Sequence, residues 1–153
     1  MNQMRLTRQT DYSLRILMFC AASGDRISRV SDIAQAYSVS ETFIFKLLKR
    51  LVDTGIVSTT RGRSGGIRLA RSAGEITVGE VVRVAEDNMS IADCFDTNAP
   101  DCPLIASCQL KIAFEQALGA FLDVLDGVTI DDLSKPSAAV INLLAQIDGP
   151  PPR

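Results

Sequence analysis

Three of the four cysteines in this 153-residue chain lie close together in the sequence. Cys94, Cys102 and Cys108 follow the spacing C-x7-C-x5-C, and Pro100 and Pro103 stiffen the polar segment around them. Iron–sulfur clusters are held mainly by thiolates, and an irregular loop can bring three of these onto one cluster. Because a cubane cluster takes four ligands, this loop leaves one ligand to come from another part of the protein.

The same spacing leaves two other chemistries open. Zinc can be bound by three cysteines and one carboxylate, and the cysteines can also be plain redox thiols. The chain has no histidine, which removes the commonest zinc ligand and the usual general base. Cys108 precedes a predicted helix, whose N-terminus favours a thiolate. Cys20 lies apart, in an apolar helical pattern that is typical of a small buried side chain.

The elements before this loop predict a helix-turn-helix. Apolar residues recur at helical spacing over 8–23, and a second helix is predicted over 28–37 with Ser28 as its N-cap. A third helix is expected to begin after the N-cap Ser40 and to end at Gly55. The third helix has an apolar stripe on one side and basic residues on the other, which is the pattern of a recognition helix.

A hairpin is predicted directly after the recognition helix. The β-type runs 56–60 and 67–70 flank the cationic, glycine-rich tip 61–66. A hairpin in this place is the wing of a winged helix, and its arginines can meet phosphates or enter a minor groove. A nucleotide-binding loop is excluded because the tip lacks the Gly-Lys-Ser/Thr ending and lies between two strands.

The second half of the chain is predicted to be helical on both sides of the cysteine loop. Thr77 and Glu80 form a capping-box pattern at the start of a helix that extends to about residue 87. A long helix over 108–126 has one apolar side, which suits the domain core or a partner helix across a dimer axis. The expected domains are 1–87 for the winged helix-turn-helix, 88–108 for the cluster loop, 108–148 for the dimerisation helix and a C-terminal helix with Ile141, Leu144 and Ile147 on its packed side, and 149–153 as a tail.

Composition and charge agree with a mainly α, winged helix-turn-helix protein of the cytoplasm. No apolar run reaches membrane-spanning length, and the polar, basic N-terminus is unlike a signal peptide. Residues 1–83 carry 13 Lys and Arg against 7 Asp and Glu, whereas residues 84–153 carry 3 against 11. Solvated surfaces give such asymmetry too, but a basic half also suits a polyanion. Because no catalytic constellation is present, we expect no enzyme and no organic small-molecule substrate.

The candidate DNA contacts come from the recognition helix and the wing. The lysines can position the protein on the phosphates, and the tip arginines Arg61 or Arg63 can read the width of the groove. Thr42 and Phe45 can make apolar contact with a thymine methyl group. Glu41 suits a cytosine amine or a cap of its own helix. The full set is Ser40, Glu41, Thr42, Phe45, Lys46, Lys49, Arg50, Arg61, Arg63, Ser64 and Arg68.

Three patches of the sequence resemble the Rrf2 family of iron–sulfur transcription regulators. They are the opening stretch Met4-Arg-Leu-Thr-Arg-Gln-Thr-Asp-Tyr12, the wing Arg61-Gly-Arg-Ser-Gly-Gly-Ile-Arg-Leu69, and the cysteine loop with the helix after it. The resemblance covers nearly the whole chain. Within the family the chain is most similar to the RirA branch of rhizobial iron regulators, through the residues around its cysteines and the stretch Thr129-Ile-Asp-Asp-Leu133.

This resemblance implies a homodimer that binds a palindromic operator in its cluster-loaded form and represses iron-responsive genes. It implies a 4Fe-4S cluster, with 3Fe-4S and 2Fe-2S as alternatives. It also places Asp11 where some relatives contribute the fourth ligand from the partner subunit, although Asp11 equally suits the helix dipole. An NsrR-like nitric oxide sensor and a zinc or thiol-redox winged-helix regulator stay open as alternatives.

Overall fold

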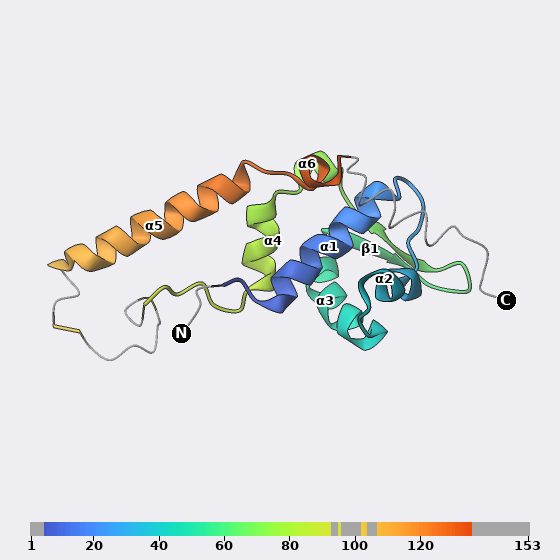
Figure 1. Ribbon diagram of the computed structural model, residues 1–153, viewed down its shortest axis with the longest axis horizontal. Helices are drawn as coiled ribbons and strands as arrows, with labels where there is room; N and C mark the ends of the chain where they lie inside the picture. Colours follow the sequence, from blue (N-terminus) through green and yellow to red (C-terminus); the bar gives the residue numbers. More distant parts are fainter. Residues whose placement is uncertain (1–4, 93–94, 96–101, 104–106, 136–153) are drawn as a thin grey trace.

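The computed structural model describes residues 5–92, 95, 102–103 and 107–135. Cys94, the predicted C-terminal helix around residues 141–147 and the tail 149–153 lie outside these residues. Six helices, one short 3-10 helix and a two-stranded antiparallel sheet are formed within the described part of the chain (Figure 1). In chain order they are α1 (Arg8–Ala22), α2 (Val30–Tyr37), α3 (Glu41–Asp53), β1 (Val57–Thr60), β2 (Gly66–Leu69), η1 (Ala73–Glu75), α4 (Val78–Ala85), α5 (Gln109–Asp126) and α6 (Ile130–Ser134).

Helix α1 is the centre of the reading head, which comprises α1–α4, the sheet and α6. It contacts α3, α4, α6 and β2, and its buried side includes Ile16, Leu17 and Phe19. Buried aliphatic side chains from the other elements complete one core around it. The helix predicted over 8–23 is therefore confirmed, and it forms the platform that holds the helix-turn-helix and the wing together.

The helix-turn-helix of α2 and α3 is confirmed with one correction. Ser40 is the N-cap of α3, and its hydroxyl accepts a hydrogen bond from Phe43 N at 3.2 Å. Gly55 follows α3 with a φ of 71°, a conformation that favours glycine. The predicted N-cap Ser28 is wrong, because α2 begins one residue later with Arg29 as its N-cap. Ser28 instead exchanges two backbone hydrogen bonds of 2.8 Å with Ile67, so that it extends the sheet of the wing.

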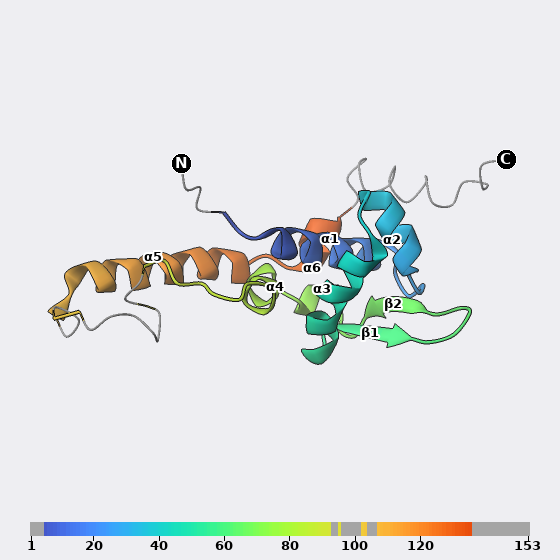
Figure 2. The same cartoon turned by 90° about the horizontal axis from the view of Figure 1, so that it is seen from below.

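The wing has the predicted strands and a register that fixes which side chains share a face. Ser58 pairs with Arg68, and Thr59 pairs with Ile67. Ile67 is buried, whereas its neighbour Arg68 is exposed. Because successive side chains of a strand point to opposite faces, Arg68 and Ile67 lie on opposite faces of the hairpin. Figure 2 shows the hairpin projecting from the reading head on the side away from α5.

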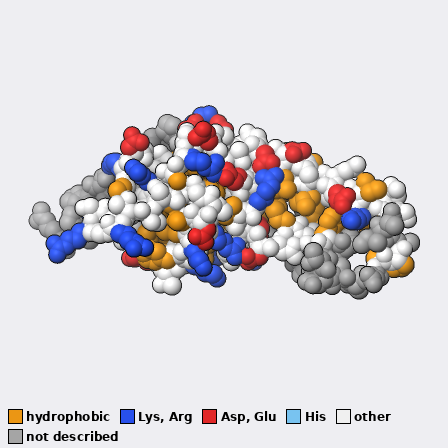
Figure 3. Space-filling model, turned by 180° about the vertical axis from the view of Figure 1, so that it is seen from behind, with side chains coloured by type: hydrophobic (Ala, Val, Ile, Leu, Met, Phe, Trp, Pro, Cys, Tyr) orange, Lys and Arg blue, Asp and Glu red, His pale blue; other side chains and the backbone are white. Residues whose placement is uncertain are grey.

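Helix α5 extends away from the reading head and has no buried side chain (Figures 1 and 2). Leu110, Ile112, Phe121 and Val124 are exposed, at 61%, 44%, 42% and 69%, and its other large apolar side chains are half-buried. Apolar side chains also show on the surface of this end of the molecule in Figure 3. The predicted helix over 108–126 is thus confirmed, but its apolar side is not part of the core of one chain. No helix among the described residues is long and apolar enough to cross a membrane.

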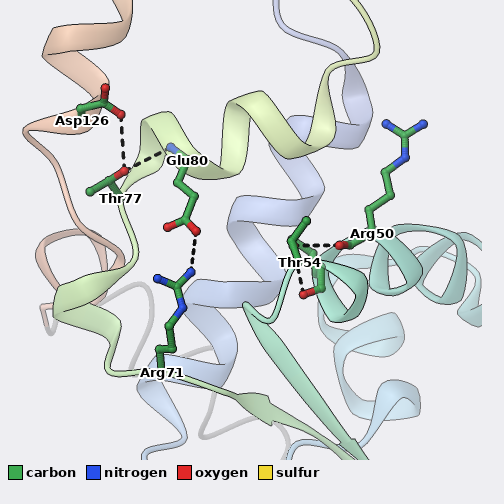
Figure 4. A network of polar contacts seen from close by, with 7 residues as sticks. Arg50, Thr54, Arg71, Thr77, Glu80 and Asp126 are labelled. Carbon is green, nitrogen blue, oxygen red and sulfur yellow. Dashed lines mark hydrogen bonds and ion pairs between the residues drawn. The ribbon is translucent and has the colours of Figure 1, made fainter.

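A polar joint connects the C-terminal end of α5 to the start of α4. The Asp126 carboxylate accepts two hydrogen bonds from Arg83, at 2.6 and 2.7 Å, and this guanidinium lowers the pKa of Asp126. Thr77 contacts Asp126 and caps α4 by accepting a hydrogen bond from Glu80 N (Figure 4). Gly79 leaves the space that the Asp126 carboxylate and the Arg83 guanidinium occupy, so a side chain at this position would have to displace their ion pair.

The predicted capping box of α4 is only half formed. The Glu80 carboxylate pairs with Arg71 at 2.5 Å (Figure 4), whereas a capping box needs it at the N-cap backbone. The reciprocal arrangement is found in α6, where Thr129 and Asp132 cap each other. Glu80 therefore forms an ion pair with Arg71, in the segment after β2, and does not cap its own helix as the local sequence predicts.

Candidate DNA interface and cluster loop

The outer face of α3 presents most of the predicted contacts to solvent. Ile44, Leu47, Leu48 and Leu51 are buried, which turns the opposite side of the helix outward. Phe45 has 56% of its surface exposed, which is unusual for a large aromatic side chain without a partner. The predicted contacts exposed on α3 are Glu41, Thr42, Phe45, Lys46 and Lys49.

A groove of about 580 Å³ lies between α3 and the wing and brings several predicted contacts together. Glu41, Phe45 and Lys49 line it from α3, and Arg61 lines it from the wing. Arg29 at the start of α2 also lines it, although sequence reasoning did not select this residue. The groove thus combines an apolar floor with cations from three elements, which suits a sugar–phosphate backbone.

The remaining wing residues divide between the tip and the opposite face. Arg63 and Ser64 are exposed at the tip. Arg68 lines a different hollow, together with Asp25, Ser58 and Arg71, on the face of the hairpin opposite Ile67. The structure therefore does not bring Arg68 together with the α3 contacts, because the strand register turns it to the other side.

Arg50 is joined to the end of α4. Its guanidinium donates a hydrogen bond of 3.0 Å to the Ala85 carbonyl and forms an ion pair with Asp87. Ala85 is the last residue of α4, so Arg50 satisfies a carbonyl that the helix itself leaves open. Among the predicted DNA contacts, Arg50 is therefore already engaged within the chain.

Glu86 is a residue that sequence reasoning missed. Its carboxylate accepts hydrogen bonds from Thr7 N at 2.6 Å and from the Thr10 hydroxyl at 2.5 Å. Thr7 is the N-cap of α1 but makes no side-chain capping bond, so Glu86 supplies an acceptor to this helix end. The sequence indicates only that an uncapped helix end needs a hydrogen-bond acceptor. It does not indicate which residue supplies that acceptor.

The two loop cysteines that the structure describes are accessible from the surface. Cys102 and Cys108 are half-buried and free, whereas Cys94 lies outside the described residues. Cys108 is the N-cap of α5, and its side chain makes no capping bond. The first turn of α5 also lacks acidic residues, so its open N–H groups suit the negative charge of an iron–sulfur centre. The donor set therefore fits such a centre.

The predicted fourth ligand is engaged elsewhere in this chain. Asp11 forms an ion pair of 3.1 Å with Arg15, one turn further along α1, and both side chains are about half exposed. Within the described ranges, no three Cys, Asp or Glu side chains are gathered as a metal site. A role for Asp11 as a ligand thus requires its release from Arg15.

A two-stranded wing directly after a capped recognition helix, with cations along both, defines a winged helix-turn-helix DNA-binding protein. The family model Rrf2, described as an iron-dependent transcriptional regulator, matches residues 6–136. The chain therefore belongs to the Rrf2 family of DNA-binding transcription regulators.

Named relatives and solved structures agree with this family. The chain is 52% identical over 147 residues to protein aau3 of Rhizobium meliloti strain 1021, covering 96% of this chain and 95% of that protein. It is 44% identical over 142 residues to the HTH-type transcriptional regulator NsrR of Bacillus subtilis strain 168, covering 92% and 97%.

Two solved structures are similar to the fold. One is CymR, the global cysteine regulator of B. subtilis, with a TM-score of 0.67, 28% identity, and 86% of this chain and 97% of that chain covered. The other is IscR of T. potens, with a TM-score of 0.64, 26% identity, and 85% of each chain covered. The winged-helix fold predicted from the sequence is thereby confirmed.

The cysteines are expected to differ sharply in reactivity. Cys20 is 2% exposed, and burial raises its pKa to about 12, so at pH 8 it is almost entirely the unreactive neutral thiol. In metal-free protein under reducing conditions, we expect iodoacetamide at pH 8 to label Cys102 and Cys108 at least tenfold faster than Cys20. Peptide mass spectrometry measures the labelling, and protein unfolded in guanidinium is the control in which all sites react. Equal labelling of Cys20 and Cys108 in folded protein would contradict this description of the core.

Proposed function

We propose that the protein is an iron–sulfur-dependent repressor that binds a palindromic operator as a homodimer in the cytoplasm and controls iron-responsive genes. The observation that carries this proposal is the position of the cysteine loop. The loop connects α4, whose C-terminal end is bonded to the recognition helix through Arg50, to α5, on which no apolar side chain is fully buried. A change in the loop can therefore reach both the DNA-reading surface and the subunit interface.

The DNA-binding part of the proposal rests on α3 and the wing. The exposed face of α3 enters a major groove, with Thr42 and Phe45 near base edges and Lys46 and Lys49 near phosphates. Arg61 and Arg63, supported by Ser64 at the tip, reach the flanking backbone or minor groove. Ser40 and Glu41 lie at the start of α3 beside these contacts. Arg50 and Arg68 are left out of the contact set, because one is paired with Asp87 and the other faces away.

The dimer part of the proposal rests on the uncovered side of α5. An 18-residue helix is roughly 27 Å long at 1.5 Å per residue, and this one buries no side chain within its own chain. Such a surface is costly to leave in water, and a second copy of the same helix is a self-complementary partner for it. Two-fold symmetry would set two recognition helices about 34 Å apart, one turn of the duplex.

In the cluster part of the proposal, Cys94, Cys102 and Cys108 of one subunit are the thiolate ligands. Asp11 of the partner subunit is the candidate fourth ligand, released from its ion pair with Arg15. When bound, an iron–sulfur cluster supplies a tight cross-link between these side chains that is sensitive to iron supply, oxygen and nitric oxide. A 4Fe-4S cluster fits three thiolates and one further ligand best.

The connection from loop to reading head runs through residues 85–87. Arg50 binds the Ala85 carbonyl and Asp87, and Glu86 binds the N-terminus of α1. Ordering the chain from residue 88 onward restrains this short segment and, through it, the angle of α3 against α1. Because a ligand shifts a conformational equilibrium only by its differential affinity, a tenfold effect on DNA binding requires about 1.4 kcal/mol.

The physiological signal has one specific competitor. The chain is 42–44% identical to several proteins named NsrR, which favours a nitric oxide-sensing repressor as the second candidate. The sequence resemblance to iron regulators favours iron. Comparing operator release on iron chelation with release on nitric oxide addition, in oxygen-free solution, separates the two.

Removal of one predicted ligand tests the cluster. We expect Cys102→Ala and Cys108→Ala each to abolish the visible absorption of anaerobically purified protein and to reduce operator affinity at least tenfold. Cys20→Ala is the matched control, because this thiol is buried in the core, and it should keep both properties. Absorption spectra and fluorescence anisotropy with a labelled operator measure the outcome. Full retention of both properties by Cys102→Ala would refute the ligand assignment.

Arg50→Gln tests the connection between the loop and the recognition helix. It removes the bonds to Ala85 and Asp87 but none of the proposed ligands, so we expect a normal cluster spectrum. The ratio of operator affinities with and without cluster should fall several-fold toward one, within the usual range of coupling effects. Arg71→Gln, which also breaks an ion pair at α4, is the matched control and should leave the ratio unchanged. An unchanged ratio for Arg50→Gln would contradict this route.

A further inference from the structure

The N-terminal turn of α1 carries a guanidinium that the function described above does not use. The Arg8 guanidinium lies 5.2 Å from the ring centroid of Tyr12 and 5.3 Å from that of Phe43. The two rings contact each other edge to face, with centroids 5.4 Å apart. The two distances from the guanidinium to the rings are within the range of cation–π attraction, so Arg8 is held against a pair of aromatic rings, one from α1 and one from α3.

Phe43 places this guanidinium beside the recognition helix. With 3.6 residues per turn, Phe43 and Arg50 follow one flank of the exposed face of α3. Glu41 and Phe45 follow the other flank, where they line the groove shared with the wing. Arg8 therefore lies at the first turn of α3, on the side opposite the wing.

Arg8 differs from its cationic neighbours in having no acidic partner among the described residues. Arg15 also lies over Tyr12, at 5.2 Å, but it is paired with Asp11. Arg50, on the same flank of α3, is paired with Asp87. Arg8 is exposed and makes no ion pair within the described ranges, so it is the guanidinium on this flank whose charge is not neutralised.

We propose that Arg8 binds a backbone phosphate of the DNA duplex on the flank of the recognition helix opposite the wing. The site rests on the proposed DNA binding and adds a contact to it. A helix in the major groove has phosphates on both sides, and the wing with Arg61 covers one of them. A guanidinium stacked on rings keeps its N–H edge free for phosphate oxygens and loses little freedom on binding. Its continuity with the cationic face of α3 selects DNA as the ligand.

The salt dependence of DNA binding tests this site. The logarithm of the binding constant falls with the logarithm of salt concentration by about 0.9 for each phosphate neutralised. We expect Arg8→Gln to flatten this slope by about 0.9 per subunit, or about 1.8 for a dimer, on a random-sequence 30-base-pair duplex. Arg15→Gln is the matched control on the same helix and the same ring, and its slope should stay within 0.3 of the unchanged protein. Arg8→Lys, which keeps the charge, should restore most of the slope.

Neutral phosphates locate the contact on the duplex. In an operator selected by the protein from random sequences, single phosphates are replaced by methylphosphonates. One replacement per half-site should weaken the unchanged protein about tenfold and Arg8→Gln by less than twofold. The phosphate site would be refuted, with DNA binding intact, if Arg8→Gln had the same salt slope as the unchanged protein and no methylphosphonate position distinguished the two proteins. Absence of salt-dependent binding by the unchanged protein would instead refute the proposed function. If Arg8→Gln does not fold, the site is tested instead by comparing the methylphosphonate scan of Arg8→Lys with that of the unchanged protein.

Discussion

The C-terminal end of α4 is the constraint on which the rest of the molecule depends. In three consecutive residues, 85–87, the chain accepts a hydrogen bond from the recognition helix, accepts two from the start of α1 and forms an ion pair with Arg50. The next residues lead directly into the cysteine loop. The same short segment therefore contacts both α1 and α3 and leads into the proposed cluster site, which is the physical basis of the coupling that we propose.

A second joint, at Asp126, limits how α5 can move. Arg83 and Thr77 hold its carboxylate, which lies in the space that a side chain at Gly79 would occupy. Helix α5 is thus attached to α4 at its C-terminal end and to the cysteine loop at its N-terminal end. In the proposed dimer, this attachment at both ends would let α5 transmit the order of the loop into the spacing of the two subunits.

The reading head was predictable because its signals are local. Helical periodicity, the Ser40 cap and Gly55 define α2 and α3, and alternating β-type residues define the wing. The errors arose where distant residues intervene. Ser28 pairs with Ile67 and Glu80 binds Arg71, and each partner lies nine or more residues away. The ion pair of Arg50 with Asp87 has no local signal in the sequence either, and the role of Arg50 toward DNA stays a prediction. The orientation of Arg68 away from the α3 contacts could have been predicted, because successive side chains of a strand point to opposite faces and its neighbour Ile67 is apolar.

The central claim is that cluster content and operator affinity change together in one sample. The most direct measurement removes iron stepwise from oxygen-protected protein and records iron, acid-labile sulfide and operator anisotropy at each step. We expect operator affinity to fall at least tenfold, in proportion to the cluster lost, while binding to random-sequence DNA changes less. Protein that contains neither iron nor sulfide when first isolated, or that binds its operator equally well at every step, would contradict it.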